Sequence, residues 1–305
     1  METRRGFMKC LAWAGTGIVW TVAGGVPKGM PLGLGLGGEA QAATTGGLTF
    51  VQISDSHIGF KAEANPDPNG TLKAALDKIA ALPNKPAMMI HTGDVTHLSK
   101  PEEFDTADQI IKGAKIDTHF IPGEHDVIGD DGKMYFERFG GKGAAPGGWY
   151  SFDQGGVHFV GLMNVIGFGP STGGTLGKEQ IEWLEKDLKG KSASTPIVVM
   201  AHIPLWSIYP QWGWTTGDAD AAFTHLKPFG SVTVLNGHIH QVVQRVEGKV
   251  TFQTAMSTAF PQPTAGSAPN PGPMKVGDKL KTMLGIREIE IAADGSPKLT
   301  DETLA

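Results

Sequence analysis

Cysteine is almost absent from this sequence, and so is any large excess of charge of one sign. The 305 residues include one cysteine, Cys10, and the formal net charge is −5 at pH 7. One thiol excludes a disulfide framework and a metal site built on several thiolates. The small negative charge gives no indication of a surface for nucleic acid. A metal centre would have to use oxygen and imidazole ligands, and the chain contains 10 histidines.

Long hydrophobic segments are also missing, apart from a short one near the N-terminus. Arg4 and Arg5 precede an uncharged apolar run over residues 10–26, which is at the short end for spanning a bilayer. Charge followed by an apolar run is typical of an export signal, and TRRGFMK resembles the twin-arginine signal of bacteria. Ala-Gln-Ala at residues 40–42 offers a cleavage site.

We therefore expect residues 1–42 to be a twin-arginine-type signal peptide, which the twin-arginine export machinery would recognise. Residues 43–305 would then form a single periplasmic or otherwise exported domain, without a stable membrane anchor after cleavage. The alternative is that the N-terminal segment stays attached as an anchor.

The residues after position 42 alternate between strand and helix patterns. Apolar runs within 47–57, 86–95 and 116–126 predict strands, and periodic apolar residues within 70–82 and 101–114 predict helices between them. This βαβαβ order favours a sheet that is covered on both faces. Further segments predict a hairpin over 148–165, helices over 176–190 and 219–229, strands within 195–206, 231–241, 249–256 and 284–295, and a loop over 261–275.

Five of the predicted strands are followed by side chains that can bind a metal or carry a proton. These side chains are Asp55 and His57, Asp94, Glu124 and His125, His202, and His238 and His240. The carboxyl ends of strands are where open α/β sheets bind their ligands. A set of carboxylates and imidazoles without thiols suits manganese, iron or zinc. The sequence therefore predicts a metal centre at this edge of the sheet.

The order DSH, GDVT, GEHD, AH and GHIH, from Asp55 to His240, resembles the calcineurin-like metallophosphoesterase family. The resemblance implies a four-layer α/β/β/α sandwich with two mixed β-sheets. It also implies two divalent or trivalent metal ions. The implied ligands are Asp55, His57 and His240 for the first metal, Asp94 for both metals, and His202, His238 and the residue at position 124 for the second.

The resemblance implies hydrolysis of a small-molecule phosphomonoester or phosphodiester by a metal-bound hydroxide. Two metals roughly 3.5–4 Å apart would hold the phosphoryl group and acidify a water molecule. By the same resemblance, His125 would assist the leaving group. Asp126 would orient His125 through its other ring nitrogen.

Glu124 departs from the family pattern, which has asparagine at this position. A charged ligand would tighten cation binding while weakening the Lewis acidity of the metal. If Glu124 points away, the second site would be weak or empty. Two alternatives to the binuclear phosphoesterase are therefore a non-catalytic periplasmic metal-binding protein and a hydrolase with one metal.

Two further features have two interpretations each. His97, three residues after Asp94, either lines the site or lies in a surface loop. The aromatic segment 206–214 either forms a wall that stacks on a base or aryl group, or is a loop anchored by its own aromatic side chains. His91, His119 and His158 lie within strand patterns, and we expect them to be structural.

Overall fold

The computed structural model describes residues 18–23, 26–31, 47–141 and 143–305. The chain divides into two compact units, residues 1–42 and 43–305. In the first, strands β1 (Ile18–Ala23) and β2 (Val26–Pro31) pair antiparallel, a hairpin that the sequence patterns do not predict. Arg4, Arg5 and the predicted cleavage motif at residues 40–42 lie outside the described residues. Among the described residues, no helix is long and apolar enough to cross a membrane.

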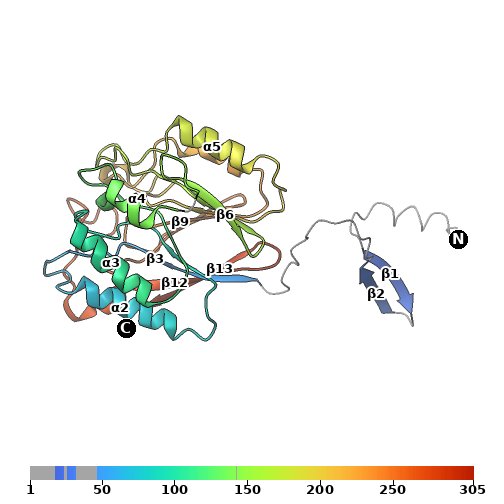
Figure 1. The fold of residues 1–305 in the computed structure, drawn as a ribbon, viewed down its shortest axis with the longest axis horizontal. Coiled ribbons are helices and arrows are strands. Elements are labelled where there is room, and N and C mark those ends of the chain that lie inside the picture. Colours follow the sequence, from blue (N-terminus) through green and yellow to red (C-terminus); the bar gives the residue numbers. More distant parts are fainter. Residues whose placement is uncertain (1–17, 24–25, 32–46, 142) are drawn as a thin grey trace. The chain divides into compact units, whose positions relative to one another are not determined.

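The larger unit contains two mixed β-sheets that pack face to face (Figure 1). The five-stranded sheet has the order β13-β12-β3-β4-β5, with β3, β4 and β5 parallel. Its strands are β3 (Leu48–Ile53), β4 (Met89–His91), β5 (Thr118–Phe120), β12 (Gly285–Ile291) and β13 (Pro297–Thr303). The six-stranded sheet has the order β10-β11-β9-β8-β7-β6, with the four strands β11, β9, β8 and β7 parallel. Its strands are β6 (Tyr150–Gln154), β7 (Val157–Gly161), β8 (Ile197–Met200), β9 (Val232–Asn236), β10 (Gln244–Glu247) and β11 (Val250–Thr254).

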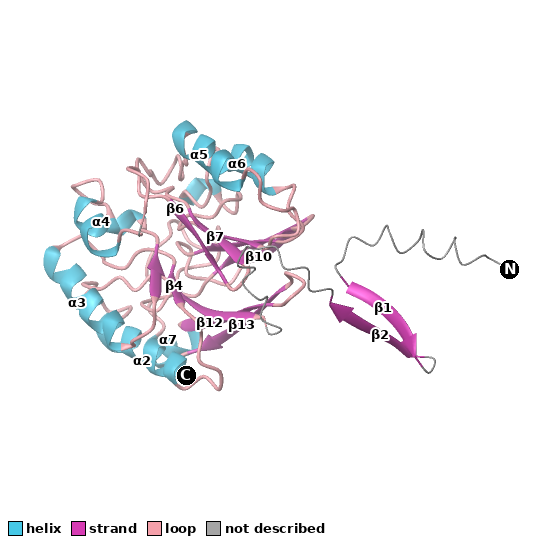
Figure 2. Cartoon of the chain, turned by 45° about the vertical axis from the view of Figure 1, so that its right-hand side comes forward, coloured by secondary structure: helices cyan, strands magenta, loops and turns pink. Residues whose placement is uncertain are grey.

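Helices cover the outer face of each sheet (Figure 2). α2 (Pro68–Ala80) and α3 (Pro101–Gly113) pack on the five-stranded sheet, and α5 (Lys178–Leu188) and α6 (Ala219–Leu226) pack on the six-stranded sheet. Shorter helical segments are α4 (Lys133–Phe139), α7 (Leu280–Met283), η1 (Glu124–Asp126), η2 (Pro210–Trp212) and η3 (Gly277–Lys279). The result is the four-layer α/β/β/α sandwich with two mixed sheets that the resemblance implied.

Central strands contribute to two cores at once because successive side chains point to opposite faces of a sheet. In β3, Phe50 lies in the core between the sheets, whereas Val51 and Ile53 pack under the helices. Val198 and Val199 of β8 divide in the same way. Strands that are buried on both faces have continuous apolar sequences, which is why the sequence predicted them.

Candidate metal centre

The loops after β3 and β4 run side by side and place three predicted ligands at one edge of the sheet. The backbone N–H of Asp55 donates to the Gly93 carbonyl at 2.9 Å, and that of His57 donates to the Asp94 carbonyl at 2.9 Å. Parallel pairing therefore continues past the strand ends. It fixes the two carboxylates and the imidazole relative to one another.

Five of the seven predicted ligands have left-handed backbone conformations. They are Asp55, His57, Asp94, His238 and His240, with φ between 40° and 71°. A non-glycine residue in this region costs about 1–3 kcal/mol and persists only where the surrounding structure imposes it. Such residues cluster at functional sites. The fold thus tolerates strain at the residues that line the predicted centre.

Pro122-Gly123 turns the chain from β5 into η1, as the sequence predicted, and brings position 124 to the centre. A side chain on Gly123 would collide with the Asp94 carboxylate, so the two loops approach closely only because this residue is glycine. The backbone N–H of His125 then donates to Asp94 Oδ1 at 2.9 Å.

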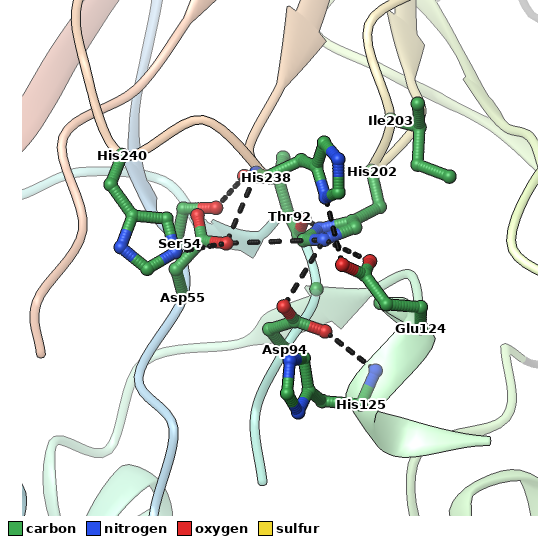
Figure 3. A network of polar contacts seen from close by, with 12 residues as sticks. Ser54, Asp55, Thr92, Asp94, Glu124, His125, His202, Ile203, His238 and His240 are labelled. Carbon is green, nitrogen blue, oxygen red and sulfur yellow. Dashed lines mark hydrogen bonds and ion pairs between the residues drawn. The ribbon is translucent and has the colours of Figure 1, made fainter. Parts of the chain in front are cut away.

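Six of the predicted ligands form two groups, which are Asp55, His57 and His240, and Glu124, His202 and His238. Figure 3 shows most of these side chains together with Asp94. In one group, His240 Nε2 lies 3.2 Å from Asp55 Oδ1 and 3.3 Å from His57 Nε2. Asp94 lies between the groups, because its Oδ2 is 3.5 Å from His57 Nε2 and 3.4 Å from His202 Nε2. The Asp94 carboxylate is thus within reach of both groups and could serve as a ligand in either.

Glu124 points into the second group rather than away from it. Its Oε2 is 2.9 Å from His202 Nε2, and its Oε1 is 2.9 Å from His238 Nδ1. Its side chain is 18% exposed. The carboxylate therefore occupies the place that a ligand at position 124 would need.

Backbone carbonyls fix the orientation of two imidazoles. His202 Nδ1 donates to the Thr92 carbonyl at 2.6 Å, and His240 Nδ1 donates to the Phe260 carbonyl at 2.5 Å. A histidine that donates from Nδ1 presents the lone pair of Nε2 to the site. Phe260 also stacks on His57, with ring centroids 4.7 Å apart.

The carboxylates draw positive charge into this buried space. Burial opposes protonation of His202, but Asp94 and Glu124 outweigh it and raise the pKa of His202 well above its usual value. Burial raises the pKa of Asp55, whereas His240 and His202 lower it to about 2. Burial and the neighbouring His125 lower the pKa of His57 well below its usual value. The site therefore favours ionised carboxylates together with cations or imidazolium.

The donor set fits metal ions. Asp55 Oδ2, Glu124 Oε2, His202 Nε2 and both ring nitrogens of His238 are buried and have no hydrogen-bond partner. The short separations around Glu124 do not have hydrogen-bond geometry, and the ligand atoms of Glu124, His202 and His238 all lie within 4.8 Å of one another. Buried polar atoms that converge in this way, without thiols, are the arrangement that Mn, Fe or Zn requires.

The predicted role of Asp126 is wrong. Its buried carboxylate accepts hydrogen bonds from the backbone of Val95, Thr96 and Gly123 at 2.8–3.0 Å, and not from His125. His125 Nδ1 instead donates to the carbonyl of His97 at 2.7 Å. The short turn of η1 directs the two neighbouring side chains in different directions. Asp126 therefore ties η1 to the loop that carries Asp94.

His97 lines the site. Its ring stacks on that of His125 with centroids 4.9 Å apart, and its Nδ1 is 3.3 Å from His57 Nδ1. His57, His97 and His125 are close enough to form a further possible ligand group. Burial and His125 lower the pKa of His97 to about 4. The sequence left this residue undecided, and its spacing from Asp94 was the available signal.

The aromatic segment is an anchored loop rather than an open aromatic wall. Trp206, Trp212 and Trp214 are buried, and the last two pack with Ile239. The three histidines within the strand patterns behave as structural residues. His91 is buried and bonds Ser56 Oγ, His158 bonds Asp153 and Asp187, and His119 stacks on Phe152.

Comparison with known proteins assigns the chain to a family. The family model described as "Calcineurin-like phosphoesterase" matches residues 48–242. The chain belongs to this family. The matched segment contains all seven predicted ligands.

Two bacterial relatives of this family member are phosphodiesterases by name. A "probable glycerophosphodiester phosphodiesterase" of Arcobacter nitrofigilis is 28% identical over 168 residues, which are 52% of this chain and 57% of that protein. A 3′,5′-cyclic-nucleotide phosphodiesterase of Nostoc is 22% identical over 220 residues, which are 70% of this chain and 79% of that protein. The chain thus spans little more than half the length of the first relative.

Solved structures show the same fold. A dimetal phosphatase of Danio rerio superposes with a TM-score of 0.58 at 13% identity, covering 85% of this chain and 99% of that one. A purple acid phosphatase from yellow lupin, Lupinus luteus, superposes with a TM-score of 0.63 at 17% identity. The superposition covers 86% of this chain and 52% of the lupin chain. At these identities, the superpositions show that the chain shares the fold of both structures.

Proposed function

We propose that the protein is an exported phosphoesterase with two metal ions, acting on small-molecule phosphomonoesters or phosphodiesters. The observation that carries this proposal is the pair of ligand groups with the Asp94 carboxylate between them. Asp55, His57 and His240 would hold one ion, and Glu124, His202 and His238 would hold the other. Bound cations of this type polarise a phosphoryl oxygen and acidify water.

The protein's own residues would orient the substrate and manage the proton. His125 lies beside Asp94 with Nδ1 bonded to the His97 carbonyl, so its Nε2 is the nitrogen left for the substrate. Burial opposes its charge, but Asp94 and Glu124 raise the pKa of His125 above its usual value. A protonated His125 at this position would donate its proton to the departing oxygen.

Metal content and turnover, measured on the same sample, test this function. We expect two equivalents of Mn, Fe or Zn per chain and hydrolysis of an aryl phosphodiester or aryl phosphate. Two metals without turnover would indicate a metal-binding protein without catalysis. One metal with full turnover would indicate a single-metal hydrolase.

Replacing Glu124 tests its part in the second ion's site. Glu124→Asn keeps an oxygen donor but removes a charge, so we expect the second metal to bind roughly tenfold or more weakly. Turnover at low metal concentration should fall and should recover when Mn²⁺ is added in excess. Metal titrations of the parent and of Glu124→Asn measure the change. An increase in affinity in the variant would show that Glu124 does not ligate.

The export part of the proposal rests on the sequence of residues 1–42. Arg4 and Arg5, the apolar run and Ala-Gln-Ala are its support. N-terminal sequencing of protein recovered from the periplasm should begin near Ala43. An Arg4→Lys/Arg5→Lys double variant should stay in the cytoplasm, since the pair is what the export machinery would read. A parent chain that stays in the cytoplasm with Met1 intact would remove this part and leave the enzymatic part standing.

A further inference from the structure

A cavity of about 310 Å³ with a mixed lining opens beside two residues of the metal centre, Glu124 and His125. The rest of its lining comes from two segments, residues 127–131 and 165–168. Most of those side chains are aliphatic or aromatic: Val127, Ile128, Val165, Ile166 and Phe168. Asp131 and Glu124 also line it, and no lysine or arginine is among its described lining residues.

Two of the lining residues are large apolar side chains that face solvent. Ile128 is 46% exposed and Ile166 is 40% exposed. Single exposed apolar residues are common on protein surfaces, but two of them in one cavity next to reactive groups are typical of a ligand site. The cavity is at the small end of the range for ligand pockets, so it suits one ring or a short alkyl chain.

Hydrogen bonds to the metal centre hold the first wall in place. The backbone N–H of Ile128 donates to Ser99 Oγ at 3.1 Å, and Ser99 Oγ–H donates to the His125 carbonyl at 2.7 Å. Ser99 itself has a left-handed backbone, with φ of 53°. The position of Ile128 is therefore set by the same segment that positions His125.

A tight turn forms the second wall. The backbone N–H of Phe168 donates to the Val165 carbonyl at 3.1 Å, which leaves Ile166 and Gly167 at the corners. Gly167 has a φ of 73°, which glycine adopts without strain. The Phe168 ring meets His238 edge-on, with centroids 5.3 Å apart. Both walls are thus preformed, and both contact residues of the metal centre.

We propose that this cavity binds the leaving group of the substrate, and that this group is an uncharged, apolar alkyl or aryl alcohol. The inference rests on the proposed function and specifies its substrate class. His125 lines the cavity and would protonate the departing oxygen, so the departing group lies on the cavity side. The Asp131 carboxylate would repel a leaving group that carries a second phosphate or a carboxylate.

Binding of n-alkylphosphonates, from methyl to hexyl, to the Mn²⁺-loaded protein tests the proposal by calorimetry. These probes carry the phosphoryl oxygens and one alkyl chain, and they are not hydrolysed. We expect Kd to fall about twofold to fourfold per methylene until the cavity is filled. 3-Carboxypropylphosphonate should bind roughly tenfold more weakly than butylphosphonate, because the Asp131 carboxylate lines the cavity.

Variants of the walls identify the cavity as the place where the chain binds. Ile128→Ser and Ile166→Ser should flatten the dependence on chain length while leaving the Kd of methylphosphonate unchanged. Asp131→Asn should reduce the discrimination against the carboxylate probe. Val246→Ser is the matched control, because Val246 is 62% exposed on strand β10 and does not line the cavity. It should behave like the parent protein.

The outcomes separate this inference from the proposed function. If methylphosphonate does not bind the Mn²⁺-loaded protein, the proposed function fails and the inference fails with it. If methylphosphonate binds but Kd is independent of chain length, the leaving-group cavity is wrong and the metal centre stands. The inference is also overturned if both serine variants keep the chain-length dependence of the parent.

Discussion

Removing metal from the purified protein with a chelator is expected to abolish phosphoester hydrolysis and to lower Tm by about 5–10 °C. This Tm shift assumes that each of two sites stabilises the folded state by about 2.7 kcal/mol, the value for a metal concentration of 100 Kd. Asp55, Asp94 and Glu124 lie close together in a buried space, with imidazole nitrogens that lack hydrogen-bond partners. Cations neutralise these carboxylates only in the folded state, so their removal destabilises that state. Activity assays and thermal unfolding with and without chelator measure both effects.

Asp94→Asn is a suitable comparison for the chelation experiment. The change is isosteric and keeps an oxygen that can accept the hydrogen bond from the His125 backbone N–H. It removes the charge shared by the two ligand groups, so chelator should lower the Tm of this variant less than that of the parent. Excess Mn²⁺ or Zn²⁺, added after chelation, should restore the Tm of the parent protein. A parent melting curve that chelator leaves unchanged would show that the folded protein does not bind metal here.

The fold and the convergence of the candidate ligands were predictable because both follow from local patterns. β3 and β8 are buried on both faces and therefore have continuous apolar sequences. The residues that follow them lie at the carboxyl edge of a sheet whatever the rest of the chain does. By contrast, β10 and the edge strand β13 are largely exposed and polar, and α4 spans only 7 residues, so none of them has a strong periodic signal.

The contacts that orient the ligands were not predictable, because they join distant parts of the chain. The Phe260 carbonyl that fixes His240 comes from a residue next to the predicted loop, 20 residues further along the sequence. The carbonyl that orients His125 belongs to His97, 28 residues earlier. A backbone carbonyl has no sequence signature, whereas the adjacent Asp126 carboxylate does. We therefore predicted Asp126, the sequence neighbour, as the partner of His125. The geometry of η1 instead directs His125 to the His97 carbonyl.

His125→Ala is expected to retain both metals and to lose turnover by roughly 10²–10⁴, the range for a positioned proton donor. The bond to Asp94 Oδ1 comes from the backbone N–H, which alanine keeps, whereas the bond from the imidazole to the His97 carbonyl is lost. The imidazole would present Nε2 to the departing oxygen, because its Nδ1 is bonded to the His97 carbonyl. Metal analysis and steady-state kinetics on the same preparation separate loss of metal from loss of proton transfer.

The leaving group decides whether His125 acts as that donor. A 4-nitrophenyl ester releases a stable phenolate and needs little protonation, whereas an alkyl ester releases a strongly basic alkoxide. The loss in His125→Ala should therefore be much larger for the alkyl ester than for the aryl ester. His225→Ala, on the outer helix α6, removes an imidazole outside the centre and should leave both rates unchanged. Equal losses for the two esters in His125→Ala would assign this histidine to steadying the phosphoryl oxygens, because that task does not depend on the basicity of the departing group.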